Sequence, residues 1–158
     1  MNNRFIGKYE REFLFKYIHE TIATNKRLVM LRIRDNGNCD KCGAEENSLH
    51  IFYFCENIKP IVTGFRNVLV KMGMRKECNL IDVLMLNFSS KDEKVTNVIS
   101  LLVSDYLYVL WVSKKKDYCN DQTFEYLKSK LNYSRWTLKC LLKDHISYFP
   151  RIYINFEF

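Results

Sequence analysis

The feature that most constrains this chain is a group of three cysteines and one histidine with the spacing C-x2-C-x7-H-x4-C. A structural zinc ion takes four such ligands, with Zn–S distances of about 2.3 Å and Zn–N distances of about 2.0 Å. Gly43 suits the tight turn after the first pair. The last two members lie a little more than one helical turn apart, so both can reach one ion. The spacing predicts a closed Zn²⁺ site with the ligands Cys39, Cys42, His50 and Cys55.

Two other interpretations of this group stay open. Free cysteines also pack as small hydrophobic side chains, so buried thiols and a core histidine would give the same spacing. A C-x2-C pair also occurs in redox proteins, although no βαβ pattern surrounds this one. The other cysteines and histidines stand alone in the sequence. We expect Cys78, Cys119 and Cys140 to be buried, and we expect no ligand role for His19 or His145.

The composition favours a helical protein in a reducing compartment. Of the 158 residues 47% are hydrophobic, and only two prolines and five glycines occur. Six cysteines without an apolar leader favour an intracellular location, cytoplasmic or nuclear, where thiols stay free for metal. We expect a mainly α fold, in which a helical domain carries a small CCHC zinc knuckle near the N-terminal third. Residues 1–60 would hold basic helices plus the knuckle and residues 61–158 a helical domain, unless the two form one continuous domain.

Hydrophobic periodicity places the helices. We expect helices over residues 9–22, 25–33, 60–72, 91–117, 121–131 and 134–146, and a short helix with His50 and Cys55 that Asn47 or Ser48 caps. The expected inward stripe of the first helix is Leu14, Tyr17, Ile18 and Ile22, and that of residues 60–72 is Ile61, Phe65, Val68 and Leu69. Residues 80–88 fit a helix or a strand, and residues 152–158 a strand or an extended arm. The apolar run from Val95 to Val112 contains Asp105, so we expect a buried central helix and no membrane span.

The charge balance is typical of a protein that binds a polyanion. The formal net charge is +7 and the sequence pI is about 9.1. A solvated basic face would have the same composition. The candidate nucleic-acid contacts lie before and within the expected knuckle, and they are Lys26, Arg27, Arg32, Arg34, Lys41 and Tyr53.

Sequence signatures of common enzymes are missing. The chain has no G-x-x-x-x-G-K-[ST] phosphate loop, no G-x-G-x-x-G and no H-E-x-x-H. Four protein ligands would also leave a zinc ion no open position for water. We therefore expect no enzymatic activity.

The neighbourhood of the ligand group resembles a known family. The segments that carry the resemblance are Ile22 to Ile33, Cys39-Asp-Lys-Cys42-Gly43, Glu45-Glu46, Leu49-His50-Ile51-Phe52, Phe54-Cys55 and Lys59-Pro60. Together they resemble the reverse-transcriptase zinc-binding region, which ends the polyproteins of non-LTR (LINE-type) retrotransposons. The resemblance covers residues 10–135. The tryptophan that often follows the last cysteine in that family is absent here.

This resemblance implies an accessory module that helps a polyprotein hold its RNA. It implies the same four metal ligands, RNA rather than DNA as the partner, and the remainder of a larger polyprotein as a second partner. The chain lacks the Tyr-x-Asp-Asp-like turn of a polymerase. The alternative function is a protein–protein interaction module in which zinc only stabilises the fold.

Overall fold

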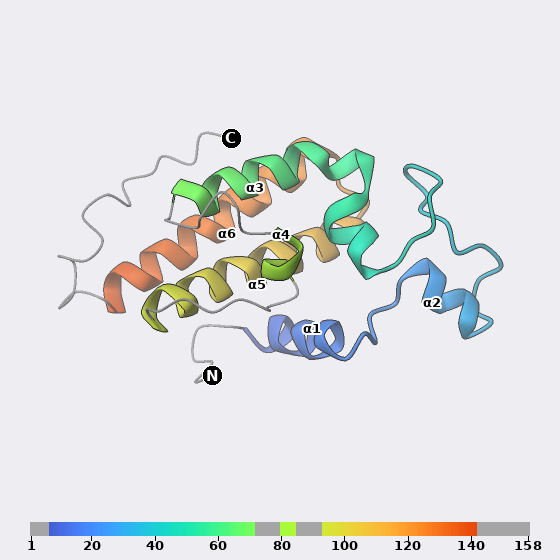
Figure 1. Cartoon of the computed structure of the whole chain (residues 1–158), viewed down its shortest axis with the longest axis horizontal. Helices are drawn as coiled ribbons and strands as arrows, with labels where there is room; N and C mark the ends of the chain where they lie inside the picture. Colours follow the sequence, from blue (N-terminus) through green and yellow to red (C-terminus); the bar gives the residue numbers. More distant parts are fainter. Residues whose placement is uncertain (1–6, 72–79, 85–92, 142–158) are drawn as a thin grey trace.

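The computed structural model describes residues 7–71, 80–84 and 93–141, and every regular element in these ranges is a helix (Figure 1). The elements are α1 (Lys8–Ile18), α2 (Asn25–Met30), the π-helical turn η1 (His50–Phe54), the 3₁₀ turn η2 (Glu56–Ile58), α3 (Lys59–Lys71), α4 (Leu80–Leu84), α5 (Glu93–Lys115) and α6 (Asn120–Leu141). One isolated antiparallel bridge joins Asn38 to Glu45. The expected mainly α fold with a Cys/His group near the N-terminal third is confirmed.

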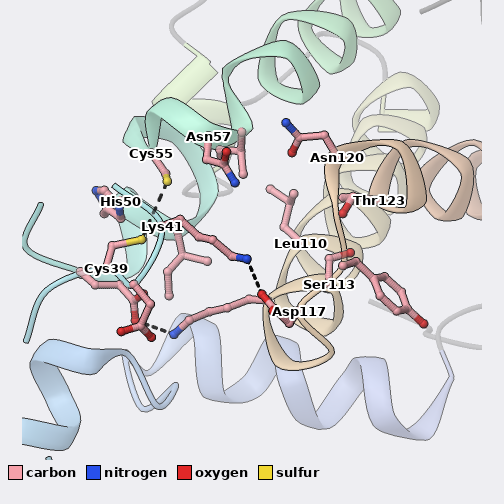
Figure 2. A pocket seen from close by; sticks show the side chains of 16 residues that line it. Cys39, Lys41, His50, Cys55, Asn57, Leu110, Ser113, Asp117, Asn120 and Thr123 are labelled. Atoms are coloured by element: carbon pink, nitrogen blue, oxygen red, sulfur yellow. Dashed lines mark hydrogen bonds and ion pairs between the residues drawn. The ribbon is translucent and has the colours of Figure 1, made fainter. Parts of the chain in front are cut away.

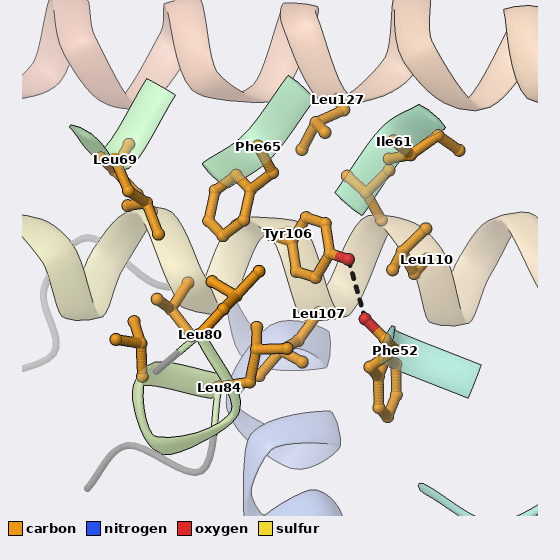
Figure 3. Close-up of a cluster of buried hydrophobic side chains, with 14 of the residues drawn as sticks. Phe52, Ile61, Phe65, Leu69, Leu80, Leu84, Tyr106, Leu107, Leu110 and Leu127 are labelled. Carbon is orange, nitrogen blue, oxygen red and sulfur yellow. Dashed lines mark hydrogen bonds between the residues drawn. The ribbon is translucent and has the colours of Figure 1, made fainter. Parts of the chain in front are cut away.

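Helix α5 forms the centre of the core. It lies between α1 on one side and α3 with α6 on the other (Figure 1). Tyr106 on α5 is fully buried, and its ring stacks on Phe65 of α3 with the centroids 4.1 Å apart (Figure 3). The expected inward residues of α3, namely Ile61, Phe65, Val68 and Leu69, are all buried. One apolar cluster contains buried side chains from both sides of residue 60. The expected division of the chain into residues 1–60 and 61–158 stays a prediction.

Helix α1 buries most of the predicted face, since Tyr17 is buried and Leu14 is partly buried, but Phe13 takes the inward place expected for Ile18. Phe13 and Tyr17, one helical turn apart, are buried, whereas Ile18 is 60% and Phe15 is 63% exposed. The Phe13 ring lies against aromatic rings of η1 and α5. The helix is therefore rotated so that Phe13, and not Ile18, packs into the core. The helix also ends at Ile18, and buried Ile22 reaches the core from the following loop.

Two other expectations about the helices differ from the structure, and one open alternative is resolved. Helix α2 ends at Met30, and the left-handed backbone of Arg32 (φ +56°) turns the chain, so that Leu31 and Ile33 are exposed. The expected break between helices 121–131 and 134–146 is absent, because one continuous helix α6 runs from Asn120 to Leu141, the last described residue. No proline or glycine occurs within it, and exposed Asn132 and Tyr133 are compatible with a helix surface. Within 80–88, residues 80–84 are helical.

Several expectations fall on parts that the structure does not describe. The arm at 152–158, His145 and Cys78 lie outside the described residues, as do the side chains of Cys140 and Val95. Cys119 is described and is exposed, so the expectation that it is buried is wrong, because it lies in the turn between α5 and α6. No described helix has the length and apolarity to cross a membrane.

Candidate metal centre

A tight backbone loop positions the first two cysteines. We call residues 37–46 the cysteine hairpin. The Cys39 amide donates to the Ala44 carbonyl at 2.7 Å, and the Gly43 amide donates to the Cys39 carbonyl at 2.9 Å. Gly43 has φ +78°, a left-handed conformation that side chains other than glycine rarely adopt. The hairpin therefore turns back at once after Cys42.

A π-helical turn positions the histidine and the third cysteine. In an α-helix, residues five apart point about 140° away from each other. Here the Cys55 amide donates to the His50 carbonyl at 3.0 Å, which closes an i→i+5 turn and brings the two side chains to the same side. The Asn47 side chain caps the turn by accepting from the His50 amide at 2.8 Å, as the sequence predicts.

The four side chains converge on one point. Their sulfur and nitrogen atoms all lie within 4.8 Å of one another. Cys39 Sγ is 4.0 Å from Cys55 Sγ, Cys55 Sγ is 3.8 Å from Cys42 Sγ, and Cys42 Sγ is 3.3 Å from His50 Nε2 (Figure 2 shows Cys39, His50 and Cys55). These separations are about twice the 2.05 Å of a disulfide bond. The group is a set of free thiols and one imidazole that could hold a metal ion.

The electrostatics of the group suit a cation. Backbone amides, that of Ala44 first, lower the pKa of the Cys42 thiol below its ordinary value. Burial raises the pKa of Cys55 to about 12, because a lone thiolate there would be poorly solvated. Burial also lowers the pKa of His50, so its imidazole stays neutral, the form that binds metals. A bound divalent ion would offset the cost of the Cys55 thiolate, because coordination deprotonates a thiol.

A buried carboxylate ties the hairpin to two other elements. The Glu46 side chain is 2% exposed, and its Oε1 accepts the Asn25 amide of α2 at 2.8 Å. The same oxygen pairs with Lys114 Nζ near the end of α5. Asn25 Nδ2 in turn donates to the Asn38 carbonyl at 2.7 Å. Sequence reasoning missed Glu46 and Lys114, because their separation of 68 positions leaves no local signal.

The basic residues predicted to bind nucleic acid mostly make contacts within the chain. Lys26 pairs with Glu45 at 2.8 Å, Arg34 pairs with Asp40, and Lys41 pairs with Asp117. Arg27 donates to the Glu20 carbonyl at 2.8 Å, and Arg34 also donates to Asn25 Oδ1 at 2.9 Å. Arg32 is exposed and has no side-chain hydrogen bond or ion pair with any described residue. Arg34 and Lys41 thus lie near the Cys/His group, but each forms an ion pair with an aspartate of the same chain.

The two neighbouring aromatic residues of η1, Tyr53 and Phe54, differ in exposure. Tyr53 is half-buried and packs against the core, while Phe54 is exposed, with the two ring centroids 4.9 Å apart. The π-helical turn decides this, because it directs Phe52 into the core.

A second basic feature lies at the end of α5. Exposed Lys115 lies 5.1 Å from the Trp111 ring centroid, and exposed Lys116 lies 5.6 Å from that of Tyr118. Neither lysine makes an ion pair within the described residues. The sequence signal for this feature is the lysine run 114–116 between two aromatic residues.

Comparisons with protein-family models, with curated proteins and with solved structures gave no match for this chain.

Proposed function

We propose that the chain is a zinc-stabilised RNA-binding accessory module related to the reverse-transcriptase zinc-binding region of non-LTR retrotransposons. The observation that carries this proposal is the closed group of three thiols and one imidazole, which shares a pocket with Tyr118 of a basic and aromatic surface. The zinc and RNA parts of the proposal rest on separate arguments.

Zinc fits the group by geometry and by ligand chemistry. With Zn–S distances of about 2.3 Å and a Zn–N distance of about 2.0 Å, the edges of a tetrahedron are about 3.8 Å between sulfurs and about 3.5 Å between sulfur and nitrogen. The separations of 3.8, 4.0 and 3.3 Å lie close to these values. Thiolate and imidazole ligands are typical of structural zinc sites. Four protein ligands leave no open position, so the ion would stabilise the fold without taking part in catalysis.

The surface at the end of α5 suits a single-stranded nucleic acid. Lys115 and Lys116 are free to contact phosphates, and they lie over the rings of Trp111 and Tyr118. Proteins that bind single strands combine such cations with aromatic platforms on which bases stack. Arg32 offers a third exposed cation. We propose these residues as the main phosphate contacts in place of Lys26 and Arg34, whose charges are paired.

The experiment compares two variants that lose the same charge. Lys115→Gln with Lys116→Gln removes the unpaired cations, whereas Lys59→Gln with Lys128→Gln removes exposed lysines that pair with Glu56 and Glu125. Binding of a single-stranded RNA is measured by fluorescence anisotropy over a series of salt concentrations, with duplex DNA as the competitor.

We expect the first variant to bind more weakly and its slope of log K against log salt to flatten by about 0.7 per lost phosphate contact. The control variant should change the slope by less. Equal slopes for the two variants would remove the α5 surface from the proposal, and a wild-type protein that binds no RNA would contradict the proposed function.

One observation favours the alternative function, a protein–protein interaction module with structural zinc. The end of α2 and the turn after it expose three large apolar side chains, those of Met30, Leu31 and Ile33. Exposed apolar groups of this kind are typical of contact surfaces. On this alternative the metal content would be the same, and RNA binding would be weak and insensitive to the Lys115 and Lys116 changes.

A further inference from the structure

A pocket lies between the Cys/His group and the corner where α5 meets α6, and Cys39, His50 and Cys55 themselves line one side of it. We call it the corner pocket, and its volume is about 140 Å³. Leu110 and Ser113 of α5 line it, together with Asn120 and Thr123 from the start of α6 and Asn57, two residues after Cys55 (Figure 2). The chain builds this wall from segments more than fifty positions apart, so no local sequence pattern indicates it.

One hydroxyl in the corner pocket has no partner. Ser113 is 5% exposed, and its Oγ makes no hydrogen bond with any described residue. Other hydroxyls in these helices are paired, since Ser104 Oγ donates to the Ser100 carbonyl at 2.7 Å and Thr123 Oγ1 to the Cys119 carbonyl at 3.0 Å. Buried polar groups are rarely left without a partner. A ligand with a polar edge would supply the one that Ser113 lacks.

The size and lining of the corner pocket suit one flat ring. A cavity of about 150 Å³ holds benzene, so this volume admits a single six-membered ring more readily than a fused pair. Ile51, Ile58 and Leu110 provide apolar surface for the ring. The lining also holds the Lys41–Asp117 ion pair and the charged residues Asp40, Glu46 and Lys114 (Figure 2). The side-chain amides of Asn57 and Asn120 each offer a donor and an acceptor at the pocket wall (Figure 2).

We propose that the corner pocket takes one unpaired pyrimidine base of a bound RNA strand. This inference rests on the proposed RNA-binding function and adds a base preference to it. A pyrimidine is a single ring with hydrogen-bonding groups along its edge, which Ser113, Asn57 and Asn120 would satisfy. Tyr118 also lines the pocket, and Lys116 lies over its ring, so a cation is available for the phosphate of the same nucleotide.

The test measures base preference in wild-type protein and in three variants. The ligands are single-stranded octamers of uridine and of adenosine, and uridine and adenosine 5′-monophosphates followed by amide NMR shifts. Ser113→Ala removes the unpartnered hydroxyl, Ser113→Leu fills the pocket, and Ser129→Ala changes an exposed serine of α6 as the control. Thermal unfolding shows that each variant is folded, and Ser113→Ala keeps the test valid if the leucine variant fails to fold.

We expect the uridine octamer to bind more tightly than the adenosine octamer. Ser113→Ala should reduce that preference by about two- to tenfold, the effect of one hydrogen bond, while Ser129→Ala leaves it unchanged. Uridine monophosphate should shift the amides of Ser113 and Asn120. Equal binding of both octamers with a steep salt dependence would overturn the pocket inference and leave the proposed function standing.

Failure of the proposed function gives a different result. If no octamer binds, the proposed function is wrong and the inference about a base of a bound strand is wrong with it, and a shift of the Ser113 amide by uridine monophosphate would then show only that the pocket takes a free pyrimidine nucleotide. If a structure of the complex shows only water on Ser113 Oγ, or if Ser113→Ala retains the full preference, the inference is wrong.

Discussion

The hydroxyl of Tyr106 donates a hydrogen bond of 2.8 Å to the main-chain carbonyl of Phe52 (Figure 3). Tyr106 lies in the middle of the central helix α5, and Phe52 lies within the π-helical turn between His50 and Cys55. Both side chains are fully buried. The helical core thus holds the turn that positions two of the four candidate ligands, and core stability and metal affinity should be linked.

Tyr106→Phe tests this link. The variant leaves a buried carbonyl without its partner, which should lower the free energy of unfolding by about 1–3 kcal/mol. It should also weaken metal binding, because η1 loses a restraint. Urea denaturation and metal competition with a chromophoric chelator measure the two effects.

A second buried tyrosine provides the control for Tyr106→Phe. The Tyr17 hydroxyl donates to the Leu84 carbonyl of α4 at 3.0 Å, and its ring, which packs edge-on against Phe52, stays in place in a phenylalanine variant. Tyr17→Phe should cost a similar free energy of unfolding and leave the metal affinity of the folded protein unchanged. An equal loss of metal affinity in both variants would contradict a specific role for the bond to Phe52.

Gly43 should tolerate only residues that adopt a left-handed backbone. Its φ is +78°, and a Cβ atom there would meet nothing within 4 Å, so any cost is conformational and not a clash. Gly43→Val should destabilise the cysteine hairpin by about 1–2 kcal/mol, and Gly43→Asn by less, because asparagine enters this region more readily. Thermal unfolding of the metal-loaded variants gives the comparison. Equal costs for Val and Asn would show that φ is not the cause.

Cys42→Ser should release the metal and loosen the cysteine hairpin while α3, α5 and α6 stay folded. Metal binding is coupled to folding where the ligands are, and the helical core has apolar contacts of its own. Hydrogen exchange should therefore increase in residues 37–46 and little in α5. Cys119→Ser removes an exposed thiol outside the group and serves as the control. Loss of most helical circular dichroism in Cys42→Ser would show that the core depends on the metal.

Acid should destabilise the protein through His50. Burial lowers the folded-state pKa of His50 below the ordinary 6.5, so the unfolded chain takes up a proton first as the pH falls. The contribution of His50 is then fully present above about pH 6.5 and is lost as the pH falls through the folded-state pKa. Metal binding should add to this trend, because the ligand imidazole must be neutral.

Urea midpoints between pH 7.5 and pH 5.5 measure this effect, in a range where most carboxylates stay ionised. His19→Gln changes an exposed histidine outside the Cys/His group and is the control variant. A midpoint that stays constant or rises as the pH falls to 5.5 would contradict the role given to His50.

Local patterns predicted the features that short stretches of chain control. The spacing of the Cys/His group, the Asn47 cap and the buried face of α3 follow from neighbours within a few positions. A proline near the start of α3 fixes where that helix begins, and its continuous apolar stripe determines which face is buried. For these local features the sequence-based predictions agree with the structure.

The sequence could not predict features that depend on partners far along the chain. Arg34 and Lys41 look like free cations until Asp40 and Asp117 are placed beside them, and Asp117 is 76 positions from Lys41. The periodicity of α1 contains several aromatic residues, and only the position of α5 decides that Phe13 is buried instead of Ile18. The corner pocket and its unpartnered Ser113 likewise exist only after α5, α6 and η1 have come together.

The most direct test of the metal centre is the zinc content of the protein purified under reducing conditions. Inductively coupled plasma mass spectrometry should find one zinc per chain in the wild type and in Cys119→Ser. It should find much less in Cys39→Ser and Cys55→Ser, each of which removes one of the four donors. A wild-type protein without zinc that also fails to bind added zinc, or a Cys55→Ser variant that keeps it in full, would contradict this account.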